Sequence, residues 1–263
     1  MIHPFVRLMR KYAIDYTNSH DLSVCDSIMH PGYRVHVSNR VLDRDSSYKS
    51  AVDALFHDFP GLQMDVHEIL TNGEMLAMRF TEHGASLRRG GRGAAWSGIG
   101  LYTWDGCRLT SNYVEQDFFA RRLQLAAGRP APIEPPHVDP WLGATVGEPC
   151  IENEETLRSW LEAGDLRPPT AIVDGSWYED CWPPPLHVET TDLTRLFSAG
   201  NKVAFHAIQT GSYCGGLFDA DARFIGRACS LRIIGIATFE DRRLNAVRII
   251  TDRDGTRSQL KAS

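Results

Sequence analysis

Two acids and a tyrosine at alternate positions are the residues of this chain best suited to acid–base chemistry. Tyr113, Glu115 and Asp117 lie in a run of strand-forming residues, and residues two apart on a strand share a face. Burial in an apolar pocket raises the pKa of a carboxyl group, which suits that group for proton transfer near neutral pH. An Asp at a strand end can instead bond a neighbouring backbone group or pair with Arg121, and the spacing leaves both interpretations open.

A second alternating set lies on the preceding strand. Trp96, Gly98, Gly100, Tyr102 and Trp104 would share one face of it. Small residues between aromatic ones leave room for a flat apolar ligand, and they also let a sheet bend. Trp96 and Tyr102 are therefore candidates for substrate contact, whereas core packing is the preferred explanation of Trp104.

The stretch that carries both sets occurs twice. Residues 91–117, GRGAAWSGIGLYTWDGCRLTSNYVEQD, align without a gap with residues 226–252, GRACSLRIIGIATFEDRRLNAVRIITD, at an offset of 135. Eight of the 27 aligned positions are identical, and Asp117 is one of them. An internal repeat of this size indicates two similar domains. We predict a first domain over residues 1–128, a linker over residues 129–149 that contains six prolines, and a second domain over residues 150–263.

The first domain must position these residues with helices and an antiparallel sheet. Apolar spacing predicts a helix over residues 4–18, Asp21 is typical of the N-cap of a short second helix, and Ser46 or Ser47 caps a third. The Asn72-Gly73 pair indicates a hairpin turn. Strands are predicted over residues 33–37, 62–70, 74–82, 94–104 and 109–117, with a leucine-rich tail over residues 123–128. This order of elements is α+β.

The second domain is predicted to be a trimmed copy. A helix is expected over residues 154–163, a first strand within residues 170–177, and further strands from residue 186. Residues 178–185 replace the third helix, because a helix cannot form through three consecutive prolines. In this copy Arg248 and Ile250 replace Tyr113 and Glu115. We therefore expect this half to act as a built-in dimer partner rather than as a second active site.

Composition excludes several classes of function. The net charge of −5 and the absence of a run rich in Lys and Arg disfavour nucleic acid as a partner. The first residues carry charges inside every apolar stretch, which predicts neither a signal peptide nor a membrane helix, so a cytoplasmic protein is expected. Six cysteines without a CxxC motif indicate reduced thiols rather than a metal site.

Three segments give the first domain a family resemblance: YRVHV, FPGLQMDVHEILTNGEMLAMRF and GIGLYTWDGCRLTSNYVEQDFFARRLQLAAG. With them the domain resembles the SnoaL-like group of the nuclear transport factor 2-like (ketosteroid-isomerase-like) superfamily. In the second half the resemblance rests mainly on the repeat. It implies two tandem cone-shaped α+β barrels, each a curved antiparallel sheet wrapped around helices with an apolar pocket inside, the second with reduced helical cover.

The resemblance also implies roles for single residues. Asp117 matches the terminal Asp that is the usual general acid/base in SnoaL-like cyclases, and its strand face, with Tyr113 and Glu115, is expected inside the cone. His36 matches a frequent histidine of the first strand. Asp65 lies near the second acid of related epoxide hydrolases, although a solvated strand position is the preferred explanation.

These features predict a cofactor-independent general acid/base enzyme of the cyclase or isomerase type. Its substrate would be a small apolar polyketide-like or cyclic-ketone metabolite in the pocket of the first domain. Asp117 would move the proton, while His36, Glu115 and Tyr113 orient the substrate. A polyether-type epoxide hydrolase is one alternative, disfavoured because Ser38 stands where a partner acid commonly follows. A non-catalytic small-molecule-binding protein is another. The two domains are expected to form an intramolecular pseudo-dimer, with a homodimer possible and no membrane partner.

Overall fold

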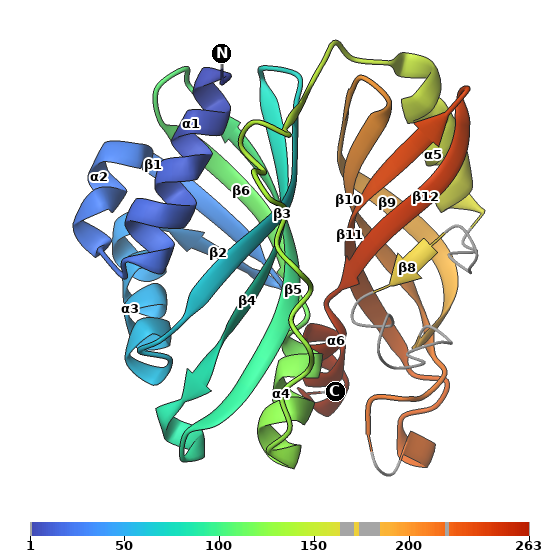
Figure 1. The fold of residues 1–263 in the computed structure, drawn as a ribbon. Helices are drawn as coiled ribbons and strands as arrows, with labels where there is room; N and C mark the ends of the chain where they lie inside the picture. The colour runs from blue at the N-terminus through green and yellow to red at the C-terminus, as the bar shows by residue number, and fades with distance from the viewer. Residues whose placement is uncertain (1, 164–170, 174–184, 219–220, 263) are drawn as a thin grey trace.

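Two separate β-sheets, each with its own helices, stand side by side along the chain (Figure 1). The computed structural model describes residues 2–163, 171–173, 185–218 and 221–262. The first sheet has seven strands in the order β2-β1-β6-β5-β4-β3-β7, and the second has five in the order β8-β12-β11-β10-β9. The predicted α+β class with two tandem sheets is therefore confirmed, and among the described residues the second sheet has fewer helices beside it than the first.

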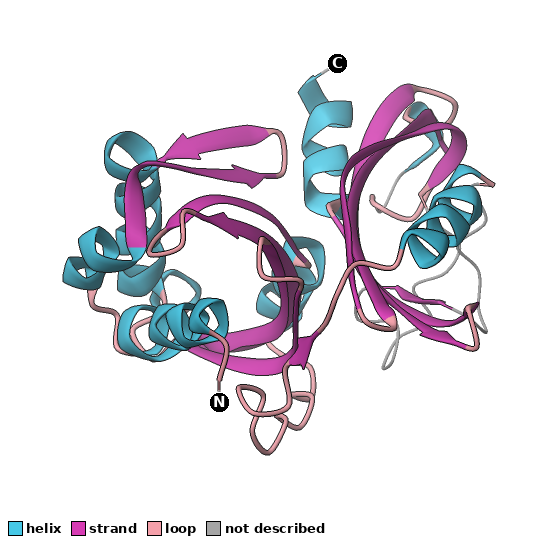
Figure 2. Cartoon of the chain, turned by 90° about the horizontal axis from the view of Figure 1, so that it is seen from above, coloured by secondary structure: helices cyan, strands magenta, loops and turns pink. Residues whose placement is uncertain are grey.

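The first sheet curves around a group of helices (Figure 2). Helix α1 begins with Pro4 at its first turn, where the missing N–H is not needed, and it continues as a π-helix, η1. Its apolar side, including Phe5, Met9 and Tyr16, is buried against the sheet. The helical elements of this half are α1 (Pro4–Lys11), η1 (Tyr12–Asn18), η2 (Leu22–Val24), α2 (Cys25–Ile28), η3 (Arg44–Tyr48), α3 (Lys49–Asp58), η4 (Leu87–Arg89) and α4 (Phe118–Ala127).

The strands of the first sheet are β1 (Met29–Val37), β2 (Arg40–Asp43), β3 (Gln63–Thr71), β4 (Met75–Ser86), β5 (Arg92–Trp104), β6 (Leu109–Gln116) and β7 (Thr145–Val146). The long strands β4, β5 and β6 pair in antiparallel fashion, whereas β1 lies parallel to β6. In this register Gly98 lies opposite both Phe80 and Gln116. A Cβ at Gly98 would lie 2.5 Å from the Phe80 ring, so only glycine lets that ring lie flat on the strand.

The end of β6 differs from the sequence prediction. The strand stops at Gln116, and Asp117 is the N-cap of helix α4, its Oδ1 accepting a hydrogen bond from the Ala120 N–H at 2.9 Å. Asp is a preferred N-cap residue, because its side chain can accept a hydrogen bond from the backbone N–H three residues later. In this sequence the preceding strand pattern obscured that helix-start signal. The helix then begins at Phe118, five residues before the predicted tail, and ends at Gly128 with φ 69°.

The second sheet contains β8 (Ala171–Val173), β9 (Leu186–Ala199), β10 (Lys202–Tyr213), β11 (Ala228–Glu240) and β12 (Arg243–Thr251), with helical elements α5 (Ile151–Glu162), η5 (Asp221–Arg223) and α6 (Arg253–Ala262). Strand β8 falls within the predicted first strand of this half and lies parallel to β12. The prediction that residues 178–185 contain no helix concerns residues that lie outside the described part of the chain, apart from residue 185.

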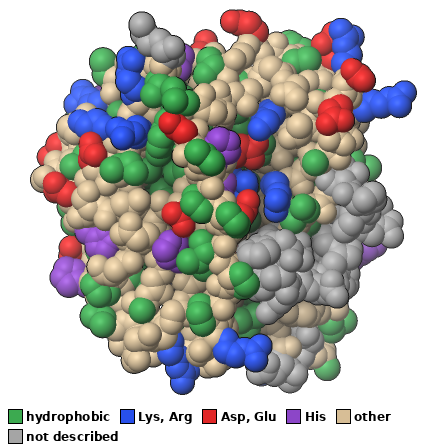
Figure 3. Space-filling model, viewed as in Figure 1, with side chains coloured by type: hydrophobic (Ala, Val, Ile, Leu, Met, Phe, Trp, Pro, Cys, Tyr) green, Lys and Arg blue, Asp and Glu red, His purple; other side chains and the backbone are tan. Residues whose placement is uncertain are grey.

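The outer faces of the two sheets pack against each other. One buried apolar cluster draws on both halves: Leu70, Ala77, Ile99, Leu101, Phe197, Ala199, Ala204, Ile234, Ile236 and Ile250. Ion pairs border it, with Lys202 Nζ 2.5 Å from Glu68 Oε1 and Arg79 Nη1 2.7 Å from Glu134 Oε2 of the linker. Charged and histidine side chains gather near the middle of this face of the molecule (Figure 3). The first sheet is thus covered on both sides.

No helix in the described part of the chain is long and apolar enough to cross a membrane.

Candidate functional site

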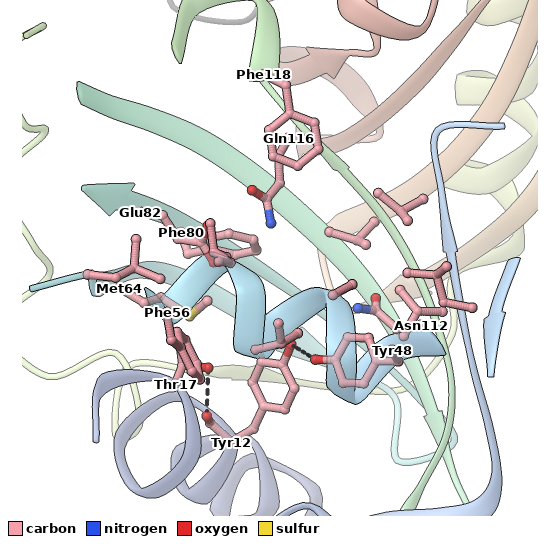
Figure 4. Close-up of a pocket in the computed structure, with 18 of the residues that line it drawn as sticks. Tyr12, Thr17, Tyr48, Phe56, Met64, Phe80, Glu82, Asn112, Gln116 and Phe118 are labelled. Atoms are coloured by element: carbon pink, nitrogen blue, oxygen red, sulfur yellow. Dashed lines mark hydrogen bonds between the residues drawn. The ribbon is translucent and has the colours of Figure 1, made fainter. Parts of the chain in front are cut away.

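A cavity of about 350 Å³ lies inside the cone of the first domain, between the curved sheet and the helices (Figure 4). Its volume is in the range of pockets that hold small organic molecules. Most of its wall is apolar, formed by Val35, Val37, Leu42, Ala51, Val52, Leu55, Phe56, Leu62, Met64, Phe80, Val114 and Phe118. Polar groups enter this wall at a few places, which is the usual composition of a ligand site.

Glu82 is the acid of this cavity. It lies on β4 with only 5% of its surface exposed, and its Oε2 has no hydrogen-bond partner among the described residues. Burial raises the pKa of Glu82 to about 7, an effect that the charge of Arg121 and the indole of Trp96 partly oppose. A carboxyl group with this pKa can accept and donate a proton near neutral pH.

Arg121 is a partly buried cation of the same cavity. It projects from the first turn of α4, and its guanidinium carbon lies 4.4 Å from the Phe118 ring centroid and 4.8 Å from that of Trp96. Burial lowers its pKa, while the nearby charges of Glu82 and Asp254 act in the opposite direction. No hydrogen bond or ion pair reaches this guanidinium from any described residue.

Four tyrosines also line the cavity, namely Tyr12, Tyr16, Tyr48 and Tyr102. The Tyr48 hydroxyl lies 3.1 Å from that of Tyr16 and 3.3 Å from that of Tyr12. Burial raises the pKa of Tyr12 to about 12 and raises those of Tyr16, Tyr48 and Tyr102 well above the ordinary value, so these groups stay protonated. Protonated phenols can donate hydrogen bonds to a substrate oxygen.

Two amides also belong to the polar lining. Asn112 and Gln116 reach the cavity from β6, as Figure 4 shows. The Oδ1 of Asn112 is buried without a partner among the described residues, whereas Gln116 Oε1 accepts a hydrogen bond of 2.7 Å from Trp96 Nε1. Asn112 can therefore bind a polar group of a ligand, and Gln116 holds Trp96 behind the cavity wall.

The prediction that Tyr113, Glu115 and Asp117 face the interior of the cone is wrong. The cavity wall takes Asn112, Val114 and Gln116 from β6, and alternate residues of a strand point to opposite sides. Tyr113 and Glu115 therefore lie on the outer face of the sheet, where Tyr113 packs against the apolar cluster between the two sheets, and Asp117 follows the strand as the N-cap of α4. A shift of one residue exchanges the two faces.

Asp117 is bound inside the contact between the domains. Both its carboxylate oxygens lie 2.8 Å from Nη2 of Arg253, and Asp117 is 1% exposed. The alternative prediction of a pair with Arg121 names the wrong cation, because Arg253 starts helix α6 of the second half directly opposite. The carboxylate of Asp117 caps one helix and binds the first residue of another.

Glu115 and His36 also face the second half. Glu115 Oε1 lies 3.1 Å from His206 Nε2, and Glu115 Oε2 accepts a hydrogen bond of 3.2 Å from the Ser38 N–H. His36 stacks on Tyr113 with 4.0 Å between ring centroids, and Arg195 Nη2 donates to the Tyr113 hydroxyl at 2.9 Å. These residues come together, but they do so at the interface and not at the cavity.

Of the remaining predicted site residues, one lines the cavity, one lies beside it and one lies elsewhere. Tyr102 lines the cavity. Trp96 lies beside it, in contact with Arg121 and Gln116. Asp65 lies outside the cavity lining, where its Oδ2 is 3.1 Å from Nε2 of His83 and both side chains are partly exposed.

Sequence reasoning missed Glu82 and Arg121. The signal for Glu82 was its place on a strand that pairs with the glycine-containing strand β5, directly opposite Trp96. For Arg121 the sequence offered no comparable signal, because its position depends on where helix α4 begins. In the described part of the chain, no group of three or more His, Cys, Asp and Glu side chains is placed to hold a metal ion.

Comparison with known proteins gives a family match in the first half. The model of the SnoaL-like domain family matches residues 10–112. No curated protein matches the sequence.

Solved structures cover about half of this chain. A candidate SnoaL-like polyketide cyclase from Jannaschia sp. CCS1 is 18% identical, with a TM-score of 0.45 over 48% of this chain and 94% of that chain. IdmH, a candidate polyketide cyclase from Streptomyces antibioticus, is 17% identical, with a TM-score of 0.42 over 47% and 98%. An epoxide hydrolase of the LEH-like type from M. tuberculosis is 14% identical, with a TM-score of 0.40 over 48% and 92%. The family match thus covers residues 10–112, which is less than half of this chain.

Proposed function

We propose that the first domain is a cofactor-independent general acid/base enzyme, of the cyclase or isomerase type, for a small and largely apolar carbonyl compound. The observation that carries the proposal is Glu82: a buried acid with a pKa of about 7 and an unpartnered oxygen, in the wall of an apolar cavity. Asp117, the acid expected from the sequence, has no part in it because Arg253 binds both of its oxygens.

The proposed chemistry begins with the carboxylate form of Glu82. An Oε atom takes the proton from the carbon next to the substrate carbonyl, the C–H bond breaks, and its electron pair passes to the carbonyl oxygen as an enolate. The tyrosine hydroxyls lie in the same cavity and can donate hydrogen bonds to that oxygen. The neutral Glu82 then returns the proton to another carbon, as in isomerisation, or to the oxygen formed when the enolate carbon adds to a second carbonyl, as in cyclisation.

The second domain is proposed as a built-in partner. Its sheet covers the outer face of the first sheet, and its Asp254 reaches the lining of the first domain's cavity. Its own counterparts of the repeated strand face are a cation and an apolar residue, Arg248 and Ile250. We therefore assign the chemistry to the first domain and a supporting role to the second.

The test is exchange of the α-protons of 2-tetralone, a bicyclic ketone, in D₂O, followed by NMR. The wild-type protein should exceed the buffer rate, and the excess should rise with pH and level off above about 7, as the base form of Glu82 accumulates. In Glu82→Gln the rate should return to that of the buffer. Glu115→Gln is the matched control, because it changes a buried acid on the opposite face of the same sheet.

Wild-type exchange by Glu82→Gln would remove Glu82 from the mechanism. A wild-type protein that binds 2-tetralone to saturation without exchanging its protons would instead favour a non-catalytic binding protein.

A further inference from the structure

The charges around the cavity do not balance. Four ionisable side chains with formal charge line it, namely Arg40, Glu82, Arg121 and Asp254. Asp254 is already neutralised, because both of its oxygens lie 2.7 Å from the guanidinium of Arg122. The exposed side chain of Arg40 has no hydrogen-bond or ion-pair partner among the described residues. Arg121 and Arg40 thus leave the cavity with excess positive charge whenever Glu82 is protonated.

Arg121 is the more informative of these two cations. A half-buried guanidinium without a carboxylate partner is unfavourable, because it loses hydration and gains only cation–π contacts with aromatic rings. Here the rings of Trp96 and Phe118 hold it from the side, at 4.8 Å and 4.4 Å. Its N–H groups have no acceptor among the described residues. The planar fork of N–H donors matches the two oxygens of a carboxylate.

We propose that the substrate of this cavity carries a carboxylate group, which Arg121 binds, with its apolar remainder lying against Phe56, Met64 and Phe80. A carboxylate fits better than a phosphate: of the two arginines that line the cavity, Arg40 is exposed and Arg121 lies partly buried in the apolar wall, and the carboxylate of Asp254 is also part of the lining. The inference rests on the proposed function only in taking the same cavity as the substrate site. Arg121 is here a binding residue, and Glu82 remains the group that moves the proton.

Two probes of equal shape test the inference. 2-Naphthoate carries the carboxylate, and 2-naphthamide replaces it with a neutral amide; affinities are measured by isothermal titration calorimetry at pH 6. At that pH the probe acid is ionised, while Glu82, with a pKa of about 7, is mostly neutral and does not repel it. The wild-type protein should bind naphthoate at least tenfold more tightly than naphthamide.

Variants then assign the preference to Arg121. Arg121→Met should lose tenfold or more in affinity for naphthoate and keep its affinity for naphthamide. Arg121→Lys should keep part of the preference, because it retains the charge without the fork, and it serves as the second variant should Arg121→Met fold poorly. Arg122→Lys is the matched control: it changes the next arginine along the helix by the same step and keeps a cation beside Asp254. It should keep the preference.

Glu82→Gln separates this inference from the proposed function. It should abolish ketone exchange yet keep the preference for naphthoate. It should also remove the decline in naphthoate affinity that we expect of the wild-type protein above pH 7, where Glu82 becomes charged. The inference is overturned if folded Arg121→Met prefers naphthoate as the wild type does. Equal wild-type affinities for the two probes would overturn it as well, and so would failure to bind both naphthoate and the smaller benzoate.

Discussion

Glu115 of the first sheet and His206 of the second are joined by a hydrogen bond of 3.1 Å across the contact between the two halves. Both side chains are buried. Desolvation raises the pKa of Glu115 and lowers that of His206, which favours the neutral form of each. The network fits this assignment: the Glu115 acid donates to Nε2, and Nδ1–H donates to Thr194 Oγ1 at 2.5 Å, which donates to the His206 carbonyl at 2.9 Å.

The neutral pair predicts that Glu115→Gln is tolerated. Its amide can donate to His206 and accept from the Ser38 N–H, so the free energy of unfolding should change by less than about 1 kcal/mol. Glu115→Ala leaves both groups unsatisfied and should cost about 2–3 kcal/mol. Urea denaturation of the three proteins at pH 7 measures both values. Equal losses in the two variants would show that the pair is ionic.

Glu82 should make stability depend on pH. Its folded pKa of about 7 lies above the ordinary value of 4.5 for a glutamate, so the folded state holds this proton more tightly than the unfolded state does. The stabilising effect is complete below pH 4.5 and is lost as pH rises to about 7. As pH rises from 4 to 8, the free energy of unfolding of Glu82→Gln should therefore increase by roughly 3 kcal/mol relative to that of the wild-type protein. If the unfolding free energies of the wild-type protein and Glu82→Gln change with pH in parallel, burial does not raise the pKa of Glu82.

The ion pair between Asp117 and Arg253 predicts a structural effect of Asp117→Asn. The amide oxygen can still cap helix α4, but the buried guanidinium loses its counter-charge, at a cost of about 3 kcal/mol in unfolding free energy. The matched control is Asp254→Asn, which removes the more exposed pair to Arg122 between the same two helices and should cost less than about 1 kcal/mol.

Asp117→Asn should also retain ketone exchange under conditions where it is folded. Loss of exchange in a folded variant would restore the catalytic role that the sequence predicted for Asp117.

Gly98 should be essential for the shape of the cavity. In Gly98→Ala the new methyl would lie 2.5 Å from the Phe80 ring and 3.0 Å from Gln116, so one of these side chains must move into the cavity. We expect a loss of about 1–3 kcal/mol in unfolding free energy and weaker binding of 2-tetralone. Gly61→Ala, where the new methyl would meet nothing within 4 Å, should change stability by less than about 0.5 kcal/mol. Equal behaviour of the two variants would contradict a steric role for Gly98.

Much of the fold followed from local patterns. The apolar spacing over residues 4–18, the turn at Asn72 and Gly73, and the repeat of residues 91–117 predicted helices, strands and the duplication as the structure has them. The short strands β2 and β7 were missed because so few residues do not show an alternating pattern. The exact boundaries of the domains and linker stay a prediction.

The sequence by itself determined the two α+β domains, the alternating sets on β5 and β6, and the helical cover of the first cone. Only the tertiary structure decided which set faces the cavity. The reason is physical: both faces of the first sheet are buried, one by its helices and the other by the second sheet, so Ile99 and Leu101 are as apolar as their neighbours. The partners of Asp117 and Glu115, Arg253 and His206, lie on distant elements that meet only when the two sheets pack.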